Sequence, residues 1–335
     1  MTYPALLLHR RSNIKSLQAI ARVEEAQNPT KAAESRGEVL AIQPRPSTRP
    51  SSLLLLRACR PRQWSKNVLV FAAPCAAGVI DRPQVALQAI GAFLVMCLVS
   101  SATYLVNDVH DREQDRQHPR KRSRPVASGA LSPRTALWLA SPLAVTGVGA
   151  AIVIAPGLGA VACVYLALTA GYSLWLRHVI VADIVVIAAG FVLRAVAGGV
   201  ATDIYLSRWF VIVTACCAVF LVAAKRYAEL REPTEADHIR ATLRLYSLEG
   251  LRLTLLVAAT LASFAYAGWA FTRPSHVLWY GLSIVPLLLW LGRYTRLIGA
   301  GAGQAPEELI LRDRTLLALS VIWGLLFLGG VYVGH

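Results

Sequence analysis

The amino-acid sequence predicts an all-α, polytopic membrane protein with a bundle of nine transmembrane helices. Of its 335 residues, 56% are hydrophobic and only 16% are charged, and the charges lie between long apolar stretches. About 20 apolar residues in succession are enough to cross a bilayer, because a helix pairs every backbone polar group internally. A large soluble helical core would instead require repeated polar faces, which these stretches lack.

Eight stretches are long and apolar enough to form membrane-spanning helices. They cover residues 84–106, 135–155, 157–176, 184–202, 207–224, 253–272, 277–291 and 315–333. A ninth stretch, residues 67–80, is shorter and contains Pro74. We count it as the first span.

Residues 1–52 differ from the rest of the chain. They are rich in Ser, Pro, Arg and Glu and contain no long apolar run. We expect a cytoplasmic tail that is either disordered or forms an amphipathic helix on the membrane surface. Residues 53–335 then form the transmembrane domain, and all the candidate catalytic residues lie in it.

The distribution of basic residues predicts the orientation in the membrane. Most of the 34 Lys and Arg residues lie in segments 1–66, 112–134, 225–252 and 293–314, whereas each connection on the other side of the membrane contains at most one. By the positive-inside rule, the N-terminus and the basic loops face the cytoplasm, as expected for a multi-pass protein of the plasma membrane. The net charge of +15 therefore reflects topology, and no basic module with interleaved aromatic residues predicts binding to nucleic acid.

The strongest functional signal is the sequence YLVNDVHDREQD at residues 104–115, where the second span ends. Asn107, Asp111 and Asp115 are spaced i, i+4, i+8, and Asp108 with Asp111 and Asp115 is spaced i, i+3, i+7, so a helix places these side chains on one face. Carboxylates this close repel one another unless a cation lies between them, and oxygen ligands without a nearby Cys suit Mg²⁺. We predict that these four residues bind Mg²⁺ and that the three aspartates are catalytic. A solvated helix end is the alternative, but it does not explain acidic residues that continue into an apolar span.

A basic loop, RQHPRKRSRP at residues 116–125, follows this acidic cluster directly. Cations next to a metal site can hold the phosphate oxygens that the metal leaves free. We expect Arg122 and Arg124 to contact such a ligand. Anchoring to anionic lipid headgroups is the alternative role for this loop.

The order NDxxDxxxD, basic loop and RP, within nine spans, resembles the UbiA superfamily of intramembrane prenyltransferases over about residues 57–335. Three further stretches are similar to one branch, the decaprenyl-phosphate phosphoribosyltransferases: RPRQWSKN at 60–67, KRYAEL at 225–230 and PEELILRDR at 306–314. The resemblance implies Mg²⁺-dependent transfer of 5-phosphoribose from 5-phosphoribosyl-1-diphosphate to a polyprenyl (decaprenyl) phosphate. It also implies a role in making arabinan precursors for the cell wall.

The loop after the sixth span departs from the superfamily pattern, in which a second aspartate motif of the DxxxD type is usual. No two aspartates here are spaced i, i+4; the candidate residues are Lys225, Arg226, Tyr227, Glu229, Glu235 and Asp237. Lys225, Arg226 and Tyr227 suit a donor that carries a 5-phosphate and ribose hydroxyls. Glu229 is a candidate catalytic residue as a metal ligand or a partner of the ribose hydroxyls; an ion pair with Arg226 or Arg231 is the alternative.

Other polar residues have two interpretations each. Lys66 precedes an apolar stretch, where its ammonium group reaches a phosphate or anchors the chain. Arg194 lies eleven residues after Asp183 on the same face of the fifth span, and it binds the polyprenyl phosphate or pairs with a polar neighbour. Trp209, Trp269, Trp279 and Trp290 are typical of an interfacial aromatic belt.

Two other functions compete with phosphoribosyl transfer. An aromatic prenyltransferase with a prenyl diphosphate donor shares the fold and the first motif, but the altered second motif counts against it. A non-enzymatic transporter is the other alternative; the acidic cluster, however, lies at one membrane face and no inverted repeat is evident. The sequence leaves the oligomeric state open, including a homo-oligomer.

Overall fold

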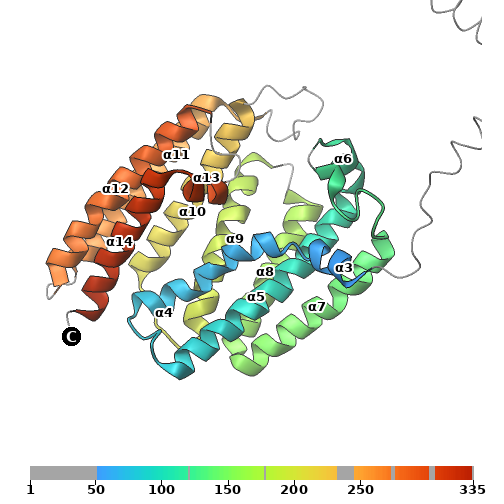
Figure 1. Cartoon of the computed structure of the whole chain (residues 1–335), viewed down its shortest axis with the longest axis horizontal. Helices are drawn as coiled ribbons and strands as arrows, with labels where there is room; N and C mark the ends of the chain where they lie inside the picture. The colour runs from blue at the N-terminus through green and yellow to red at the C-terminus, as the bar shows by residue number, and fades with distance from the viewer. Residues whose placement is uncertain are drawn as a thin grey trace, which may run out of the picture. The chain divides into compact units, whose positions relative to one another are not determined.

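The computed structural model describes residues 51–119, 121–176, 179–231, 245–272, 276–301 and 306–333. Within these residues the fold is all-α (Figure 1). Eight helices are long and apolar enough to cross a membrane: α5 (Pro83–His110), α7 (Pro133–Ile154), α8 (Pro156–Leu174), α9 (Ile180–Ala201), α10 (Arg208–Arg231), α11 (Leu248–Phe271), α12 (Val277–Gly299) and α14 (Arg314–Tyr332). This confirms the predicted class. Residues 1–50, which include nearly all of the predicted tail, and Glu235 and Asp237 lie outside the described residues.

The predicted first span is not a regular α-helix. After the short helix α3 (Ser52–Ala58), the chain forms a 3₁₀-helix, η1 (Pro61–Phe71), and then α4 (Ala72–Ala76). A 3₁₀-helix rises about 2.0 Å per residue, compared with 1.5 Å for an α-helix, so η1 and α4 together extend over roughly 30 Å. This is about the thickness of the hydrocarbon core, so the tighter helix gives a short segment the reach of a span.

Local sequence signals set where several helices begin. Ser132, Ser247 and Asp313 cap α7, α11 and α14, and each side-chain oxygen accepts a hydrogen bond from a backbone N–H in the first turn, at 3.0, 2.9 and 2.9 Å. Such caps satisfy N–H groups that have no partner inside the helix. Proline begins α5, α7 and α8, at the one position where its missing N–H costs nothing.

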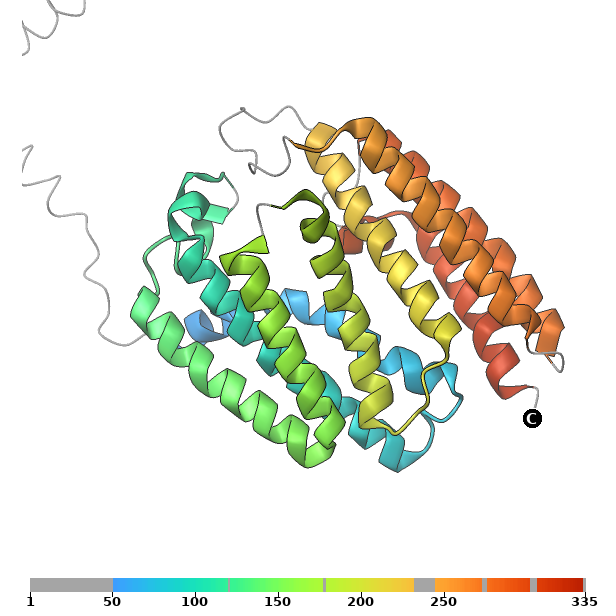
Figure 2. The same ribbon diagram turned by 180° about the vertical axis from the view of Figure 1, so that it is seen from behind.

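The helices form two groups. One contains η1, α5, α7, α8 and α9, and the other contains α10, α11, α12 and α14, with the short helix α13 (Pro306–Arg312) against α14. Contacts of α9 with α10 join the groups, and Figure 2 shows α8, α9 and α10 side by side. Each group has its own buried apolar cluster, one around Met96 and Leu158 and the other around Phe220 and Tyr294.

A buried polar network fixes η1 to the helices behind it. Arg194 of α9 donates from Nε to Asn67 Oδ1 at 2.7 Å, from Nη1 to the Gly190 carbonyl at 2.6 Å and from Nη2 to the Tyr165 hydroxyl at 2.8 Å. Asn67 in turn donates to Ser100 Oγ of α5 at 3.3 Å. Because both Arg194 and Asn67 are almost completely buried, these bonds replace the water that their polar groups lose.

Gly198 allows η1 to approach α9 closely. A Cβ atom at Gly198 would lie 1.8 Å from the carbonyl oxygen of Val70 and 2.7 Å from its carbonyl carbon. Backbone atoms cannot rotate away as a side chain can, so any larger residue must push η1 off α9.

We therefore expect Gly198→Ala to destabilise the protein by about 1–3 kcal/mol, the usual range for overpacking a filled interior. Thermal unfolding in detergent would measure the effect. Gly149→Ala in α7 is the matched control, because a Cβ there meets no atom within 4 Å. Equal melting temperatures for the two variants would contradict this account of the η1–α9 contact.

Candidate active site

The acidic cluster lies where α5 ends and the short helix α6 (Arg112–Gln117) begins. The Asp111 N–H donates to the Asn107 carbonyl and the Asp115 N–H donates to the Asp111 carbonyl, both at 2.8 Å. The i, i+4 spacing thus continues across the junction, and Asn107, Asp111 and Asp115 remain on one face. Asp108 and Asp115 are 2% and 3% exposed, whereas Asn107 and Asp111 are half-buried.

Two arginines neutralise the buried carboxylates. Arg124 Nη1 contacts Asp108 Oδ1 at 3.3 Å and Asp115 Oδ2 at 2.5 Å. Arg60 Nη2 also pairs with Asp108 Oδ1. Because both carboxylates contact one guanidinium nitrogen, their oxygens lie within a few ångströms of each other and converge on a cation.

Arg60 combines this ion pair with a strained backbone. Its φ of 54° and ψ of 61° are left-handed, which costs a non-glycine residue roughly 1–2 kcal/mol. Its guanidinium also lies over the ring of Tyr104, 5.3 Å from the centroid. Strain of this kind persists only where the surroundings hold it, and it is concentrated at functional sites.

The donor atoms of the cluster fit a magnesium ion. In the described part of the chain no three carboxylate, thiol or imidazole groups form a ready-made metal cage. Mg²⁺ does not need one, because it usually takes one or two protein carboxylates and completes its shell with water and phosphate oxygens. Asp108 and Asp115 supply convergent carboxylates. The Asn107 Oδ1 atom lies on the same helix, where it accepts a hydrogen bond from Ser173 Oγ at 2.6 Å.

A second charged cluster is centred on Asp183 of α9. Arg226 of α10 donates two hydrogen bonds to this carboxylate, from Nε to Oδ2 at 2.6 Å and from Nη2 to Oδ1 at 3.0 Å. The third nitrogen, Nη1, contacts Glu229 Oε2 at 2.5 Å, and Lys225 Nζ lies 4.0 Å from Glu229 Oε1. Asp183 and Arg226 are buried, whereas Lys225 and Glu229 are partly exposed.

Tyr246, just before α11, borders the second cluster. Burial and the negative charge of Asp183 raise the pKa of Tyr246 to about 12, although Arg226 acts in the opposite direction. The phenol therefore stays protonated at physiological pH and can donate a hydrogen bond. No sequence pattern predicted a role for Tyr246, because it lies between a polar stretch and the cap of α11, far along the chain from either motif.

The last turn of α8 joins the two clusters. Tyr172 donates its hydroxyl hydrogen to Asp183 Oδ1, and the next residue, Ser173, donates to Asn107. Ser173 and Asp183 are buried. Two consecutive side chains of one helix thus connect the acidic cluster with the second charged cluster.

The remaining residues predicted to bind substrate differ in how accessible the structure leaves them. Arg122 is exposed in the short 3₁₀-helix η2 (Lys121–Ser123), and Lys66 is half-buried in η1. Tyr227 packs into two apolar clusters, with Arg231 over its ring at 5.8 Å. Arg194 is 4% exposed and bonded to internal groups, which favours its pairing with polar neighbours over phosphate binding.

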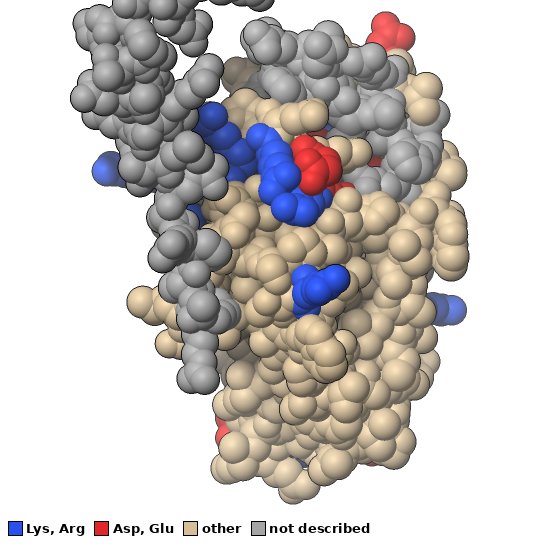
Figure 3. All heavy atoms as spheres, turned by 90° about the vertical axis from the view of Figure 1, so that its right-hand side faces the viewer, with Lys and Arg blue, Asp and Glu red and all other residues tan. Residues whose placement is uncertain are grey.

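The surface around the first cluster is charged, whereas much of the protein surface is not. On the face drawn in Figure 3, most of the visible Lys, Arg, Asp and Glu side chains gather toward one end. The side chains of Arg60 and Arg124 are about a quarter exposed and extend from the buried carboxylates to the accessible surface.

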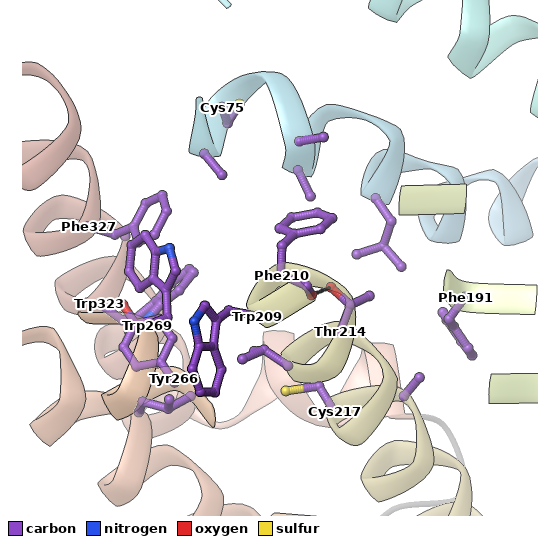
Figure 4. A pocket seen from close by; sticks show the side chains of 18 of the residues that line it. Cys75, Phe191, Trp209, Phe210, Thr214, Cys217, Tyr266, Trp269, Trp323 and Phe327 are labelled. Carbon is purple, nitrogen blue, oxygen red and sulfur yellow. Dashed lines mark hydrogen bonds between the residues drawn. The ribbon is translucent and has the colours of Figure 1, made fainter. Parts of the chain in front are cut away.

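An apolar cavity of about 860 Å³ lies between the two helix groups (Figure 4). Its wall includes aromatic side chains from α10, α11, α12 and α14, among them Trp209, Phe210, Tyr266, Trp269, Trp290, Trp323 and Phe327. Two of the lining hydroxyl groups are already bonded: Thr214 Oγ1 donates to the Phe210 carbonyl at 2.7 Å, and Ser320 Oγ donates to the Leu316 carbonyl at 2.8 Å. The cavity therefore presents hydrocarbon and aromatic surface.

The cavity and the second cluster share α10. Cys217 and Leu221 line the cavity, and Lys225 follows them at the same four-residue spacing on the same helix face. Trp209, Trp269 and Trp290, interpreted from the sequence as interfacial belt residues, line the cavity as well. Sequence periodicity could not reveal this, because a cavity-facing and a lipid-facing tryptophan have the same apolar neighbours along the chain.

Membrane-length helices that enclose both paired charges and an apolar cavity define a polytopic membrane protein with an amphiphilic site. A sequence profile described as the UbiA prenyltransferase family matches residues 68–312, and the chain belongs to this family of transferases.

The chain is similar to two proteins named decaprenyl-phosphate phosphoribosyltransferase. The one from Mycobacterium tuberculosis is 42% identical over 283 residues, which is 82% of this chain and 93% of the relative. The one from Corynebacterium glutamicum is 41% identical over 290 residues, which is 83% of this chain and 87% of the relative.

Solved structures share the fold at low sequence identity. A UbiA homolog from Archaeoglobus fulgidus bound to GPP and Mg²⁺ has a TM-score of 0.63 at 16% identity and covers 84% of this chain and 99% of its own. A digeranylgeranylglyceryl phosphate synthase has a TM-score of 0.59 at 14% identity and covers 83% of this chain and 97% of its own. These likenesses show that the described part of the chain has a UbiA fold.

The Asp183–Arg226 pair should behave as a buried ion pair. Removing one partner leaves the other charge buried and uncompensated, which typically costs about 3–5 kcal/mol. Asp183→Asn and Arg226→Gln should each lower the melting temperature in detergent, and the double variant should recover part of the loss. The exposed Glu113–Arg116 pair, at 3.2 Å, is the control, and its variants should change stability by about 1 kcal/mol or less. Additive losses for Asp183 and Arg226 would show that the two side chains do not depend on each other.

Proposed function

We propose that the protein transfers 5-phosphoribose from 5-phosphoribosyl-1-diphosphate to a polyprenyl phosphate such as decaprenyl phosphate, with release of diphosphate. The observation that carries this proposal is the pair of charged clusters joined by the end of α8, next to an apolar cavity. The names of the mycobacterial and corynebacterial relatives support the same reaction.

The two clusters suit the two anionic ends of such a donor. Asp108, Asp111 and Asp115, with Asn107, would hold Mg²⁺, which supplies charge neutralisation to the diphosphate leaving group. Arg124, Arg122 and Lys66 are the candidates for the remaining diphosphate oxygens. The 5-phosphate and the ribose of the donor would be bound by the second cluster. Its candidates are the catalytic residue Glu229 and the substrate-binding residues Lys225, Arg226 and Tyr227. Of these, Lys225 and Glu229 are the accessible groups, Arg226 is buried against Asp183, and Tyr227 packs among apolar side chains.

The cavity suits the lipid. A polyprenyl chain offers only hydrocarbon, and the cavity wall offers apolar and aromatic side chains whose neighbouring hydroxyls are already bonded. With the chain in the cavity, the lipid phosphate would lie toward the second charged cluster, which begins one turn beyond the cavity wall on α10 and where the ribose of the donor would be held. A prenyl diphosphate with an aromatic acceptor would leave the cations of the second cluster without a substrate partner, which favours the phosphoribosyl donor.

The chemistry then requires positioning more than proton transfer. The bond between ribose C1 and the diphosphate oxygen breaks, and its electron pair leaves with the diphosphate. An oxygen of the lipid phosphate, already an anion, attacks C1 from the opposite face and forms the new C–O bond. Inversion converts an α-linked donor into a β-linked product. The residues of the two clusters contribute by orienting the donor and neutralising charge.

The position of the basic loops supports an orientation with the site at the cytoplasmic face of the plasma membrane. Residues 112–134 and 225–252 carry many of the basic residues, and both flank the charged clusters. The polar donor then enters from the cytoplasm, and the lipid product is available for arabinan synthesis in the cell wall.

Asp115→Asn should abolish phosphoribosyl transfer while the protein stays folded in detergent. The test supplies membranes with labelled phosphoribosyl diphosphate and polyprenyl phosphate and measures labelled lipid. Glu113→Gln is the matched control, because the Glu113 side chain is 72% exposed and pairs with Arg116. Near-normal turnover of Asp115→Asn at saturating Mg²⁺ would exclude the carboxylate as an essential ligand.

The proposal also predicts that the Michaelis constants of the two substrates can be changed separately. A charge-assisted contact to phosphate contributes about 1.5–3 kcal/mol, so Lys225→Ala should raise the constant for phosphoribosyl diphosphate about tenfold or more. Thr214→Trp, which fills the cavity, should instead raise the constant for polyprenyl phosphate. Val153→Trp on the exposed face of α7 is the control for added bulk. Activity with a prenyl diphosphate and an aromatic acid would favour the prenyltransferase alternative.

A further inference from the structure

The acidic cluster is balanced by the protein's own cations. Two buried carboxylates, Asp108 and Asp115, face two guanidinium groups, Arg60 and Arg124. The guanidinium group of Arg124 lies where the two carboxylates converge, which is also the position that a bridging metal ion needs. A divalent cation and these arginines therefore compete for the same oxygens.

Both arginines can change partner without a change in backbone. Arg124 lies in a tight turn whose backbone is fixed: its N–H donates to the Lys121 carbonyl at 2.9 Å, and its own carbonyl accepts from the Ser128 N–H at 2.9 Å. The next residues, Pro125 and Val126, are buried. The side chain remains 28% exposed, so rotation about its own bonds can bring the guanidinium to a ligand outside the cluster.

The Arg60 side chain can also change partner while its backbone, at the junction of α3 and η1, stays in place. Its carbonyl accepts from the Gln63 N–H at 2.8 Å and its N–H donates to the Arg57 carbonyl at 3.2 Å, which fixes the junction of α3 and η1. The side chain is 22% exposed and lies between the buried Asp108 and the ring of Tyr104.

We infer that Arg60 and Arg124 are exchangeable counter-ions that bind Asp108 and Asp115 in the absence of substrate and move to the donor's diphosphate when Mg²⁺ takes the carboxylates. This inference rests on the proposed function and adds Arg60 to the donor-binding residues. Each buried carboxylate then keeps a cationic partner before and after loading, which avoids the high cost of an uncompensated buried charge.

The exchange makes metal and donor binding cooperative. Metal alone must displace the arginines, and donor alone finds the arginines already bound to carboxylates, so each ligand binds weakly without the other. Thermodynamic linkage requires the two effects to be equal. Removing the Arg60 charge should therefore strengthen metal binding and weaken donor binding. Neither a residue that only binds phosphate nor a purely structural residue would produce these opposite effects.

The experiment measures both ligands on the full-length protein in detergent. Binding of Mn²⁺, as a paramagnetic substitute for Mg²⁺, is followed by electron paramagnetic resonance without donor. Binding of labelled phosphoribosyl diphosphate is followed by equilibrium dialysis at saturating Mg²⁺. Arg60→Gln should bind Mn²⁺ about tenfold more tightly and the donor about tenfold more weakly than the wild type. Gln meets the same left-handed backbone as Arg, so the substitution leaves the local strain unchanged.

Two further variants separate the inference from its alternatives. Arg62→Gln removes an exposed charge two residues away and should change Mn²⁺ affinity less than about twofold, whereas a general electrostatic effect would raise it as Arg60→Gln does. Arg60→Lys keeps the charge and should retain weak Mn²⁺ binding, which also covers the case in which Arg60→Gln fails to fold. Unchanged or weaker Mn²⁺ binding in Arg60→Gln overturns the exchange but leaves the proposed function intact. Absence of Mn²⁺ binding in every protein, with and without donor, overturns the proposed metal site itself.

Discussion

The constraint on which this structure depends is that a charge buried among membrane helices must have a partner. Asp183 holds Arg226 through two hydrogen bonds, and Asp108 and Asp115 share Arg124. Without these pairs, the desolvated side chains would each cost several kcal/mol. The Asp183–Arg226 pair also fixes the separation of α9 and α10, and the contacts of Arg124 hold its turn against α5 and α6. The same contacts therefore stabilise the bundle and define the geometry of the site.

Arg194 satisfies the constraint in another way. Its hydrogen-bond partners among the described residues are neutral: an amide oxygen, a carbonyl and a phenol. The first of them, Asn67, belongs to η1, the segment that replaces a regular first span. A 3₁₀-helix has poorer hydrogen-bond geometry than an α-helix. The Arg194 network and the close contact at Gly198 thus hold in place the element that delivers Arg60 to the acidic cluster.

The sequence predicted most of the fold, because spans and loops follow from the local density of apolar and charged residues. It also predicted the face shared by Asn107, Asp111 and Asp115, since that face depends only on helical spacing. It did not predict which charges pair across helices. The Asp183–Arg226 pair joins residues 43 positions apart, and the cavity wall draws single residues from several helices. The place of Trp269 in the cavity wall was not predicted for the same reason, because no local pattern tells which neighbour a helix face meets.

The last turn of α8 has a consequence for how this chain can vary. Tyr172 and Ser173 contact different clusters, so their directions about the helix axis must both be correct. An α-helix turns about 100° per residue, and a single insertion within α8 would therefore rotate both side chains away from Asp183 and Asn107 together. Length changes in the connections at the far end of the bundle, such as residues 202–207, carry no such penalty for the two clusters. The length of α8, as well as its composition, is therefore subject to the demands of the site.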